Sequence, residues 1–192
     1  TLAELAERIE RARRAGRTFA TPPLERRGGD RDAVPLSFAQ QRLWFLEHFE
    51  PGLPLYNIPI SLLLEGRLEA QALAAALNEV LRRHEELRTA FGSEQGKPIQ
   101  VIRPHRIQPL PVVDLAGIPE RSRQSAVHAL SRRQARRPFD LARGPVLRVV
   151  LLRLAAQEHL LLLVIHHIAF DGWSGGVVLR ELAALYQAAA TG

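Results

Sequence analysis

The chain has 192 residues, 46% hydrophobic and 24% charged, which suits one well-packed soluble domain; the lack of cysteine excludes disulfides and thiol nucleophiles. The net charge of +6 comes almost wholly from arginines interleaved with acidic residues, without an aromatic-rich basic stripe, so no nucleic-acid partner is expected. No apolar run approaches the roughly 20 residues of a membrane span, and no signal-peptide core is present, so no membrane partner and a cytoplasmic location are expected.

The first predicted elements are a helix over residues 1–15 and a linker over residues 16–33. Three apolar residues at i, i+3 and i+7 form one short helical stripe: Leu2, Leu5 and Ile9. The linker contains paired prolines and paired glycines without hydrophobic periodicity. The main domain is therefore expected at residues 34–192.

A second helix is predicted to begin after Ser37, which suits an N-cap, and to end at Pro51-Gly52. A strand follows over residues 56–64, where Pro59 favours the edge of a sheet or a bulge.

The clearest helix is predicted over residues 68–87. Its apolar stripe consists of Leu73, Leu77, Val80, Leu81, His84 and Leu87. Arg83 and Arg88 are five residues apart, so on a continuous helix they diverge by about 140°. They are not expected to share a partner unless the helix ends between them.

The second half of the chain predicts further strands and helices. A short strand at 99–102 precedes a proline-broken extended segment at 104–114 and an arginine-rich surface helix at 122–137. A hairpin is expected from residues 146–154 and 159–165, and an amphipathic helix at 177–186 closes the chain. Helices mixed with a sheet predict an α+β fold, an α/β two-layer sandwich.

Two adjacent histidines, His166 and His167, follow the most apolar run of the chain at residues 160–165. The run predicts a buried strand, and strand ends beside loops often carry catalytic side chains. Because successive strand residues face opposite ways, one histidine is expected to enter the packing and the other a cavity. A lone buried histidine is more often a packed core residue, but the residues that follow favour a site.

The loop after the histidines carries three polar or small residues. Asp171 lies four residues after His167, where a carboxylate can orient the loop or the ring. Gly172 indicates a tight turn or a close backbone approach, and Ser174 can cap the next helix. No metal site is expected, because the chain lacks cysteine and adjacent strand histidines diverge.

Residues 166–174, His-His-Ile-Ala-Phe-Asp-Gly-Trp-Ser, resemble the HHxxxDGWS signature of condensation domains of nonribosomal peptide synthetases. These domains are members of the chloramphenicol-acetyltransferase-like superfamily. Residues 37–46 are similar to the family's SxAQxRLWxL motif, and residues 83–91 to its RHExLRTxF motif. Ile165 and Phe170 stand where the family often has Met and Ser, at positions that do not carry the chemistry.

The resemblance implies a mixed sheet packed with helices and assigns roles to the motif residues. His167 is the implied catalytic residue, which accepts a proton or hydrogen-bonds the attacking amine. The implied supporting residues are His166, Asp171, Gly172, Arg83 and Arg88, with one of the two arginines paired to the aspartate. The implied structural residues are Ser37, Gln40, Arg42, Trp44 and Trp173, the last in a packing role.

The resemblance also implies amide formation between donor and acceptor thioesters. The substrates would arrive on 4'-phosphopantetheine arms of an upstream donor and a downstream acceptor carrier domain, with an adenylation domain in the same assembly line. No cofactor is expected to bind this domain directly. Residues 1–9 are similar to the last helix of a carrier domain, so residues 1–15 are expected to be the end of a preceding carrier; the alternative is an N-terminal helix of this domain. A direct junction with a carrier implies an L-configured donor.

The chain ends before the family's later motifs, so it resembles an N-terminal lobe whose C-terminal lobe is missing. Such a lobe is expected to be inactive alone and to expose apolar surface. Three alternatives stay open: an epimerization domain, a coenzyme A-dependent acyltransferase and a non-catalytic docking fragment.

Overall fold

The computed structural model describes residues 1–14 and 34–191, so the linker predicted at 16–33 lies outside the described residues. The chain divides into two units, Thr1–Asp30 and Arg31–Gly192. In the first, helix α1 (Leu2–Arg14) covers the helix predicted at the start of the chain, and none of its residues is buried. Two ion pairs at i, i+4 spacing, Glu7 with Arg11 and Glu10 with Arg14, lie along its surface.

The second unit combines four helices with seven strands among its described residues. The helices are α2 (Phe38–Phe49), α3 (Ala70–Arg83), α4 (Glu120–Arg136) and α5 (Gly172–Thr191), with short 3-10 turns η1 (Pro54–Tyr56) and η2 (Glu85–Arg88). The strands are β1 (Val34–Pro35), β2 (Asn57–Glu65), β3 (Thr89–Glu94), β4 (Lys97–Ile102), β5 (Val112–Asp114), β6 (Leu147–Ala155) and β7 (Glu158–His166).

The strands form two sheets, ordered β1-β4-β3 and β2-β7-β6-β5. The predicted hairpin is present as antiparallel β6 and β7, and β5 runs parallel to β6, so the larger sheet is mixed. Strand β2 pairs with β7 only and lies at the edge, as Pro59 indicated, because proline cannot donate to a second neighbour. The predicted class of helices with a mixed sheet is confirmed.

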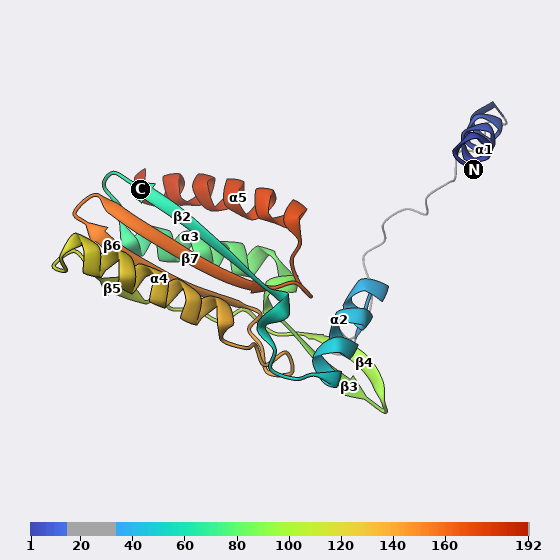
Figure 1. The fold of residues 1–192 in the computed structure, drawn as a ribbon, viewed down its shortest axis with the longest axis horizontal. Coiled ribbons are helices and arrows are strands. Elements are labelled where there is room, and N and C mark those ends of the chain that lie inside the picture. Colours follow the sequence, from blue (N-terminus) through green and yellow to red (C-terminus); the bar gives the residue numbers. More distant parts are fainter. Residues whose placement is uncertain (15–33, 192) are drawn as a thin grey trace. The chain divides into compact units, whose positions relative to one another are not determined.

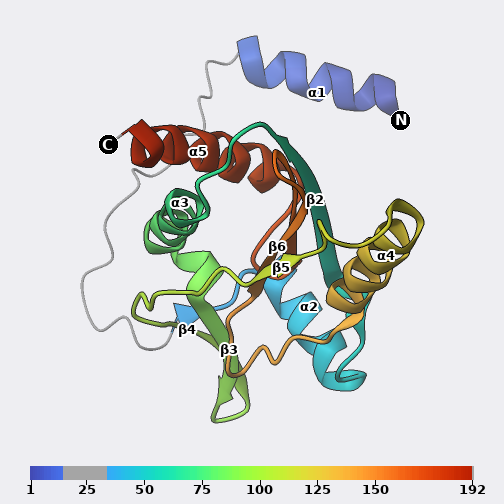
Figure 2. The same ribbon diagram turned by 90° about the vertical axis from the view of Figure 1, so that its left-hand side faces the viewer.

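Helices cover both faces of the larger sheet (Figures 1 and 2). Alternation along β7 sends Leu161, Leu163 and Ile165 into a core shared with α3 and α5. On the opposite face, Leu162 packs in a cluster that includes apolar residues of α4. The buried strand that ends at the two histidines is therefore held from both sides.

Among the helix boundaries that differ from the sequence prediction, two lie in the motifs. Helix α3 ends at Arg83, because His84 leaves the helical region with φ −99° and ψ 97°, and the motif continues as η2 and β3. Helix α5 begins at Gly172, five residues before the predicted start. Among the described residues, no helix is long and apolar enough to span a membrane.

Candidate functional site

The end of β7 is fixed by backbone hydrogen bonds to the residues that directly precede its two neighbouring strands, β6 and β2. The N–H of His166 donates to the carbonyl of Val146 at 2.9 Å, and the N–H of His167 donates to the carbonyl of Tyr56 at 2.8 Å. The two histidines thus start from a rigid part of the sheet, and their side chains diverge as the strand alternation predicts.

His166 lies in the packing, with only 1% of its surface exposed. Its Nδ1 accepts from the Ile168 N–H at 3.1 Å, so the proton of the neutral ring lies on Nε2. That nitrogen is buried without a partner among the described residues, and the ring meets Phe139 edge-on. The pKa of His166 is lowered to about 4, mainly because burial disfavours the charged ring and to a smaller extent because of the charges of His167 and Arg148. His166 is therefore neutral at pH 7.

His167 lines a cavity of about 570 Å³ with residues of α2 and of the loop before α5. Its Nδ1 lies 2.6 Å from the carbonyl oxygen of Phe170. A carbonyl can only accept, so Nδ1 carries the proton and the neutral ring presents the Nε2 lone pair. No other described residue hydrogen-bonds to this ring. The adjacent histidines thus have opposite tautomers, and only His167 keeps a free acceptor in a cavity.

Gln40 connects α2 to the loop that follows His167. Its side-chain oxygen accepts from the Ser37 N–H at 2.9 Å, while Ser37 Oγ accepts from the Gln40 N–H at 3.3 Å, which completes a capping box. The amide nitrogen of Gln40 then donates to the Ile168 carbonyl at 3.4 Å. One side chain therefore closes the start of α2 and holds the loop beside the cavity.

Asp171 begins α5 instead of pairing with an arginine. Its Oδ1 accepts from the N–H of Ser174 at 2.8 Å and from its Oγ at 2.6 Å. These two hydrogen bonds lower the pKa of Asp171, and the bond from the Ser174 hydroxyl has the larger effect. The predicted cap is corrected: Asp171 is the cap residue and Ser174 its partner, because the helix begins at Gly172 and not farther along the chain.

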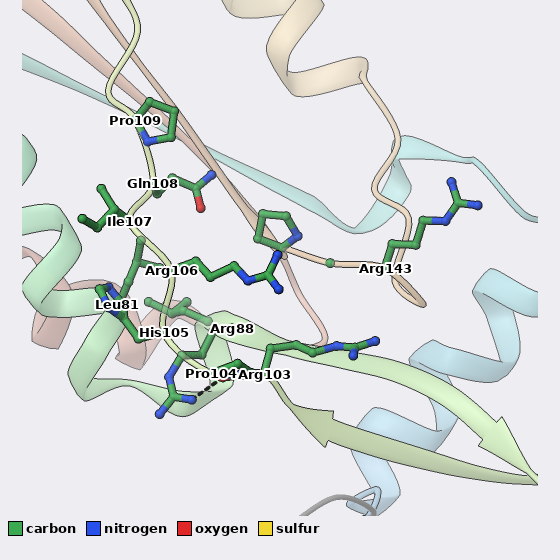
Figure 3. Close-up of a pocket in the computed structure, with 13 residues that line it drawn as sticks. Leu81, Arg88, Arg103, Pro104, His105, Arg106, Ile107, Gln108, Pro109 and Arg143 are labelled. Atoms are coloured by element: carbon green, nitrogen blue, oxygen red, sulfur yellow. Dashed lines mark hydrogen bonds between the residues drawn. The ribbon is translucent and has the colours of Figure 1, made fainter.

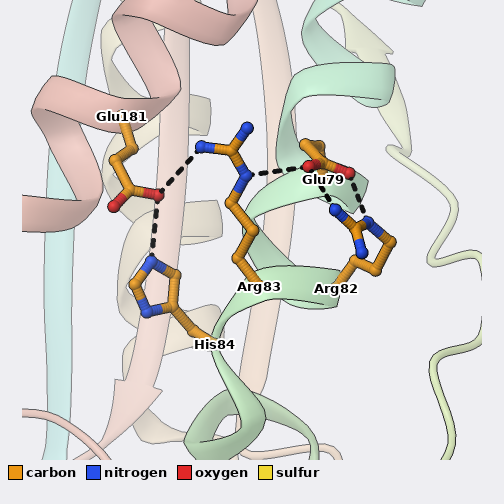
Figure 4. A network of polar contacts seen from close by, with 5 residues as sticks. All are labelled: Glu79, Arg82, Arg83, His84 and Glu181. Atoms are coloured by element: carbon orange, nitrogen blue, oxygen red, sulfur yellow. Dashed lines mark hydrogen bonds and ion pairs between the residues drawn. The ribbon is translucent and has the colours of Figure 1, made fainter.

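The expected pairing of Asp171 with Arg83 or Arg88 is wrong for the described residues. Arg83 Nε instead donates to Glu79 Oε1 at 2.8 Å, and Arg83 Nη1 lies 3.8 Å from Glu181 Oε2 on α5 (Figure 4). The same Glu181 oxygen lies 3.0 Å from His84 Nε2. These contacts connect α3 to α5. The hydrogen bonds from Arg82 and Arg83 lower the pKa of Glu79 to about 2.

Arg88 also has partners away from the histidines. Its guanidinium bonds to Glu85 Oε1 at 3.1 Å and to the backbone carbonyl of Arg103. The helix does end between Arg83 and Arg88, but the turn η2 directs them to different partners.

Comparison with known proteins decides the family. The model of the condensation domain matches residues 30–192. The chain belongs to the condensation-domain family. It is 48% identical over 155 residues to a linear gramicidin synthase of Brevibacillus parabrevis, covering 81% of this chain and 3% of that protein. It is 45% identical over 182 residues to a phosphinothricin tripeptide synthetase of Streptomyces viridochromogenes, covering 95% of this chain and 17% of that protein.

Solved condensation domains share the fold. The starter condensation domain of rhizomide synthetase has a TM-score of 0.76 and 28% identity, over 83% of this chain and 40% of that one. The first condensation domain of the calcium-dependent antibiotic synthetase, solved with a substrate analogue, has a TM-score of 0.70 and 25% identity, over 79% and 36%. The chain thus spans less than half of each solved domain.

The remaining motif residues of this condensation domain have diverse surroundings. Trp44 stacks on His48 with ring centroids 5.1 Å apart and packs against the core cluster around Phe139. Arg42 is exposed and lines the His167 cavity. Trp173, expected to pack, is 83% exposed, because it occupies an outward position in the first turn of α5.

Gly172 does not need its expected backbone freedom in this structure. Its φ lies outside the left-handed region, and a Cβ at this position would meet nothing within 4 Å among the described residues. The physical reason is its place as the first residue of a helix, where any L residue can adopt the backbone angles.

Two residues near the histidines, Arg148 and Tyr56, were not predicted as site residues from the sequence. Arg148 lies over the Phe139 ring at 3.6 Å and donates to the carbonyls of Gln134, Arg137 and Pro138 at the end of α4. Burial lowers its pKa to about 10. The one sequence signal was an arginine next to the start of the apolar strand β6, which also contains Arg153. Tyr56, which precedes β2 and lines the His167 cavity, carried no signal beyond its strand position.

Proposed function

We propose that this chain is the N-terminal lobe of a condensation domain that joins a donor acyl thioester and an acceptor aminoacyl thioester through an amide bond. The observation that carries the proposal is the bond from His167 Nδ1 to the Phe170 carbonyl, because it leaves Nε2 as a proton acceptor in a cavity. The buried, neutral His166 has the complementary role of holding the strand end.

In the proposed step, the acceptor amine attacks the donor carbonyl carbon, so a C–N bond forms and the C–S bond breaks. His167 Nε2 takes the proton that the amine loses, and the departing thiolate then takes this proton. The products are one amide and one free thiol. Such general-base assistance contributes about 10²–10⁴-fold to a rate. Gln40 and Asp171 act by holding the two ends of the loop that positions His167.

The substrates in this proposal are carried on 4'-phosphopantetheine arms of an upstream donor carrier and a downstream acceptor carrier, which an adenylation domain loads. The small share of each synthetase that this chain spans, 3% and 17% for two relatives, supports an assembly line around it. Helix α1 and residues 16–33 are then the end of the donor carrier and its linker. A direct junction of this kind makes an L-configured donor the expected subtype.

A C-terminal lobe is needed to complete the proposed site. The chain spans 40% of the solved rhizomide synthetase domain. Large apolar side chains on α2 and in the first turn of α5 are exposed in this chain: Phe38, Phe45, Phe49 and Trp173. We expect the lobe to be inactive alone and this surface to be covered in the full domain.

A second candidate function is acyl transfer from a free coenzyme A thioester. The observation in its favour is a rhizomide synthetase starter domain solved in complex with C8-CoA and Leu-SNAC, with a TM-score of 0.77 to this chain. The same histidine chemistry serves both candidates, and only the donor differs.

The test joins the chain to its native C-terminal lobe and measures dipeptidyl-thioester formation from two loaded carriers, with His167→Ala and His128→Ala as paired variants. His128 is a matched control, because it is an exposed histidine on α4 and does not line the His167 cavity. We expect His167→Ala to lower the rate about 10²-fold or more while His128→Ala keeps it.

Other outcomes separate the alternatives. Product from an acyl-coenzyme A donor but not from a loaded donor carrier would favour the second candidate. Chiral inversion of a loaded residue without condensation would favour an epimerization domain, and no reaction at all from a folded domain would favour a docking role. A full rate in His167→Ala would remove the base role.

A further inference from the structure

A second cavity, of about 650 Å³, lies beside the loop between β4 and β5 and shares no lining residue with the His167 cavity. Apolar side chains from the end of α3 and from η2, Leu81 and Leu87, form part of its wall. Among the described residues, no aspartate or glutamate lines this cavity. Its other walls carry arginines from three segments: Arg88, Arg103, Arg106 and Arg143.

The loop that presents these arginines is anchored at both ends. At one end the N–H of Arg103 donates to the Arg88 carbonyl at 3.2 Å, and the Arg88 guanidinium donates back to the Arg103 carbonyl. At the other end Asn78 on α3 accepts from the Gln108 N–H at 2.7 Å and donates to the Gln108 carbonyl at 3.0 Å. The arginines of this loop therefore start from a fixed backbone.

The positive charge in this cavity is only partly compensated. Arg88 is paired with Glu85, and Arg143 lies 3.6 Å from Asp140. Within the described ranges, no carboxylate lies within 4.0 Å of Arg103 or Arg106, although like charges that line one cavity repel each other. Figure 3 shows both side chains extending from the loop toward the side where Arg143 lies.

Two nitrogens of lining residues also lack partners. Arg88 Nε and His105 Nε2 are buried and make no hydrogen bond to any described residue. Buried polar atoms normally have a partner, so these nitrogens add unmet hydrogen-bonding capacity beside the cavity among the described residues, although their burial keeps them from contacting a ligand directly. The fixed loop and the two arginines without a carboxylate partner among the described residues together point to an anion.

We propose that this cavity binds the phosphoryl group of a phosphate ester, with Arg103 and Arg106 as its main ligands. Guanidinium groups match the oxygens of a phosphate with paired hydrogen bonds, which explains arginine in preference to lysine here. The apolar wall at Leu81 and Leu87 receives the organic part of the ester. Two sources share this chemistry: a free nucleotide and, if the proposed function holds, the phosphopantetheine arm.

The test is calorimetric titration of the 192-residue chain with four probes at one ionic strength. Two carry a phosphate, 4'-phosphopantetheine and adenosine monophosphate, and two lack it, pantetheine and adenosine. Each phosphorylated probe that binds should bind about tenfold more tightly than its unphosphorylated counterpart, because hydrogen bonds to charged groups are worth that much. Preference between the two phosphorylated probes identifies the source.

The decisive variants carry equal changes of charge. Arg103→Gln with Arg106→Gln should lose the phosphate preference, whereas Arg132→Gln with Arg136→Gln on the exposed face of α4 should keep it. Equal binding of phosphorylated and unphosphorylated probes, or equal losses in both double variants, would overturn the proposal. The titration does not depend on amide formation, and His167→Ala should bind phosphate normally, so this result is independent of the proposed function.

Discussion

The α3–α5 side of the larger sheet and the α2 side of the His167 cavity differ in how fully their side chains are covered. On the first side, alternate residues of β6 and β7 are buried under two helices, and the polar residues between α3 and α5 find partners in one another. On the second side, α2 leaves Phe38 91% exposed and Trp173 on α5 is 83% exposed. The α3–α5 side is thus a closed core among the described residues, whereas the α2 side exposes large apolar side chains, as the proposed contact with a C-terminal lobe requires.

The largest expected effect on stability comes from the covered side. Leu161→Ala removes a side chain that is 0% exposed at the centre of β7, so we expect a loss of about 2–5 kcal/mol in the free energy of unfolding. Leu63→Ala on the edge strand β2 is the matched control, because Leu63 is largely exposed, and should change stability by about 0.5 kcal/mol or less. Urea unfolding of both variants measures the difference, and similar losses would contradict the contrast.

A pH effect of intermediate size is expected from the histidine at the boundary of the two regions. Because burial lowers the pKa of His166 from 6.5 to about 4, the unfolded chain takes up a proton before the folded chain does as the pH falls. Stability should therefore be unaffected by this group above pH 6.5 and decrease between pH 6.5 and 4, by up to about 3 kcal/mol.

The measurement is urea unfolding across this pH range in wild type, His166→Leu and His128→Ala. His166→Leu should lose this part of the acid sensitivity, whereas His128→Ala, which changes an exposed histidine, should keep it. An unchanged slope in His166→Leu would show that other groups cause the acid sensitivity.

The smallest effect on the chain itself is expected at Gly172. Gly172→Ala should change the stability of this chain by about 0.5 kcal/mol or less, since a Cβ there meets nothing within 4 Å among the described residues and the backbone is helical. If the proposed C-terminal lobe or the substrate approaches this backbone closely, the same variant joined to that lobe should lose activity while its stability is kept. Full activity in the joined variant would leave Gly172 without a contact that requires glycine.

The local sequence determined the parts of the site that depend on alternation and capping. The apolar run before His166 predicts a buried strand, and period-two alternation alone sends one histidine into the core and the other to a cavity. Ser37 as an N-cap predicts the start of α2, because a cap needs only neighbours along the chain, and in the structure Gln40 completes a capping box with it. The order of the three motifs likewise predicts the family.

Only the tertiary structure decided the partners of the charged motif residues. Nothing in the sequence near Arg83 indicates Glu181, which is far along the chain and lies beside it only because α3 and α5 pack on one face of the sheet. Because α3 ends at Arg83, Arg88 lies on a separate turn and pairs with Glu85. Asp171 accepts from the N–H of Ser174 and so caps its own helix, α5. Ion pairs between distant elements depend on helix ends and packing, whereas strand alternation and caps are set within a few residues.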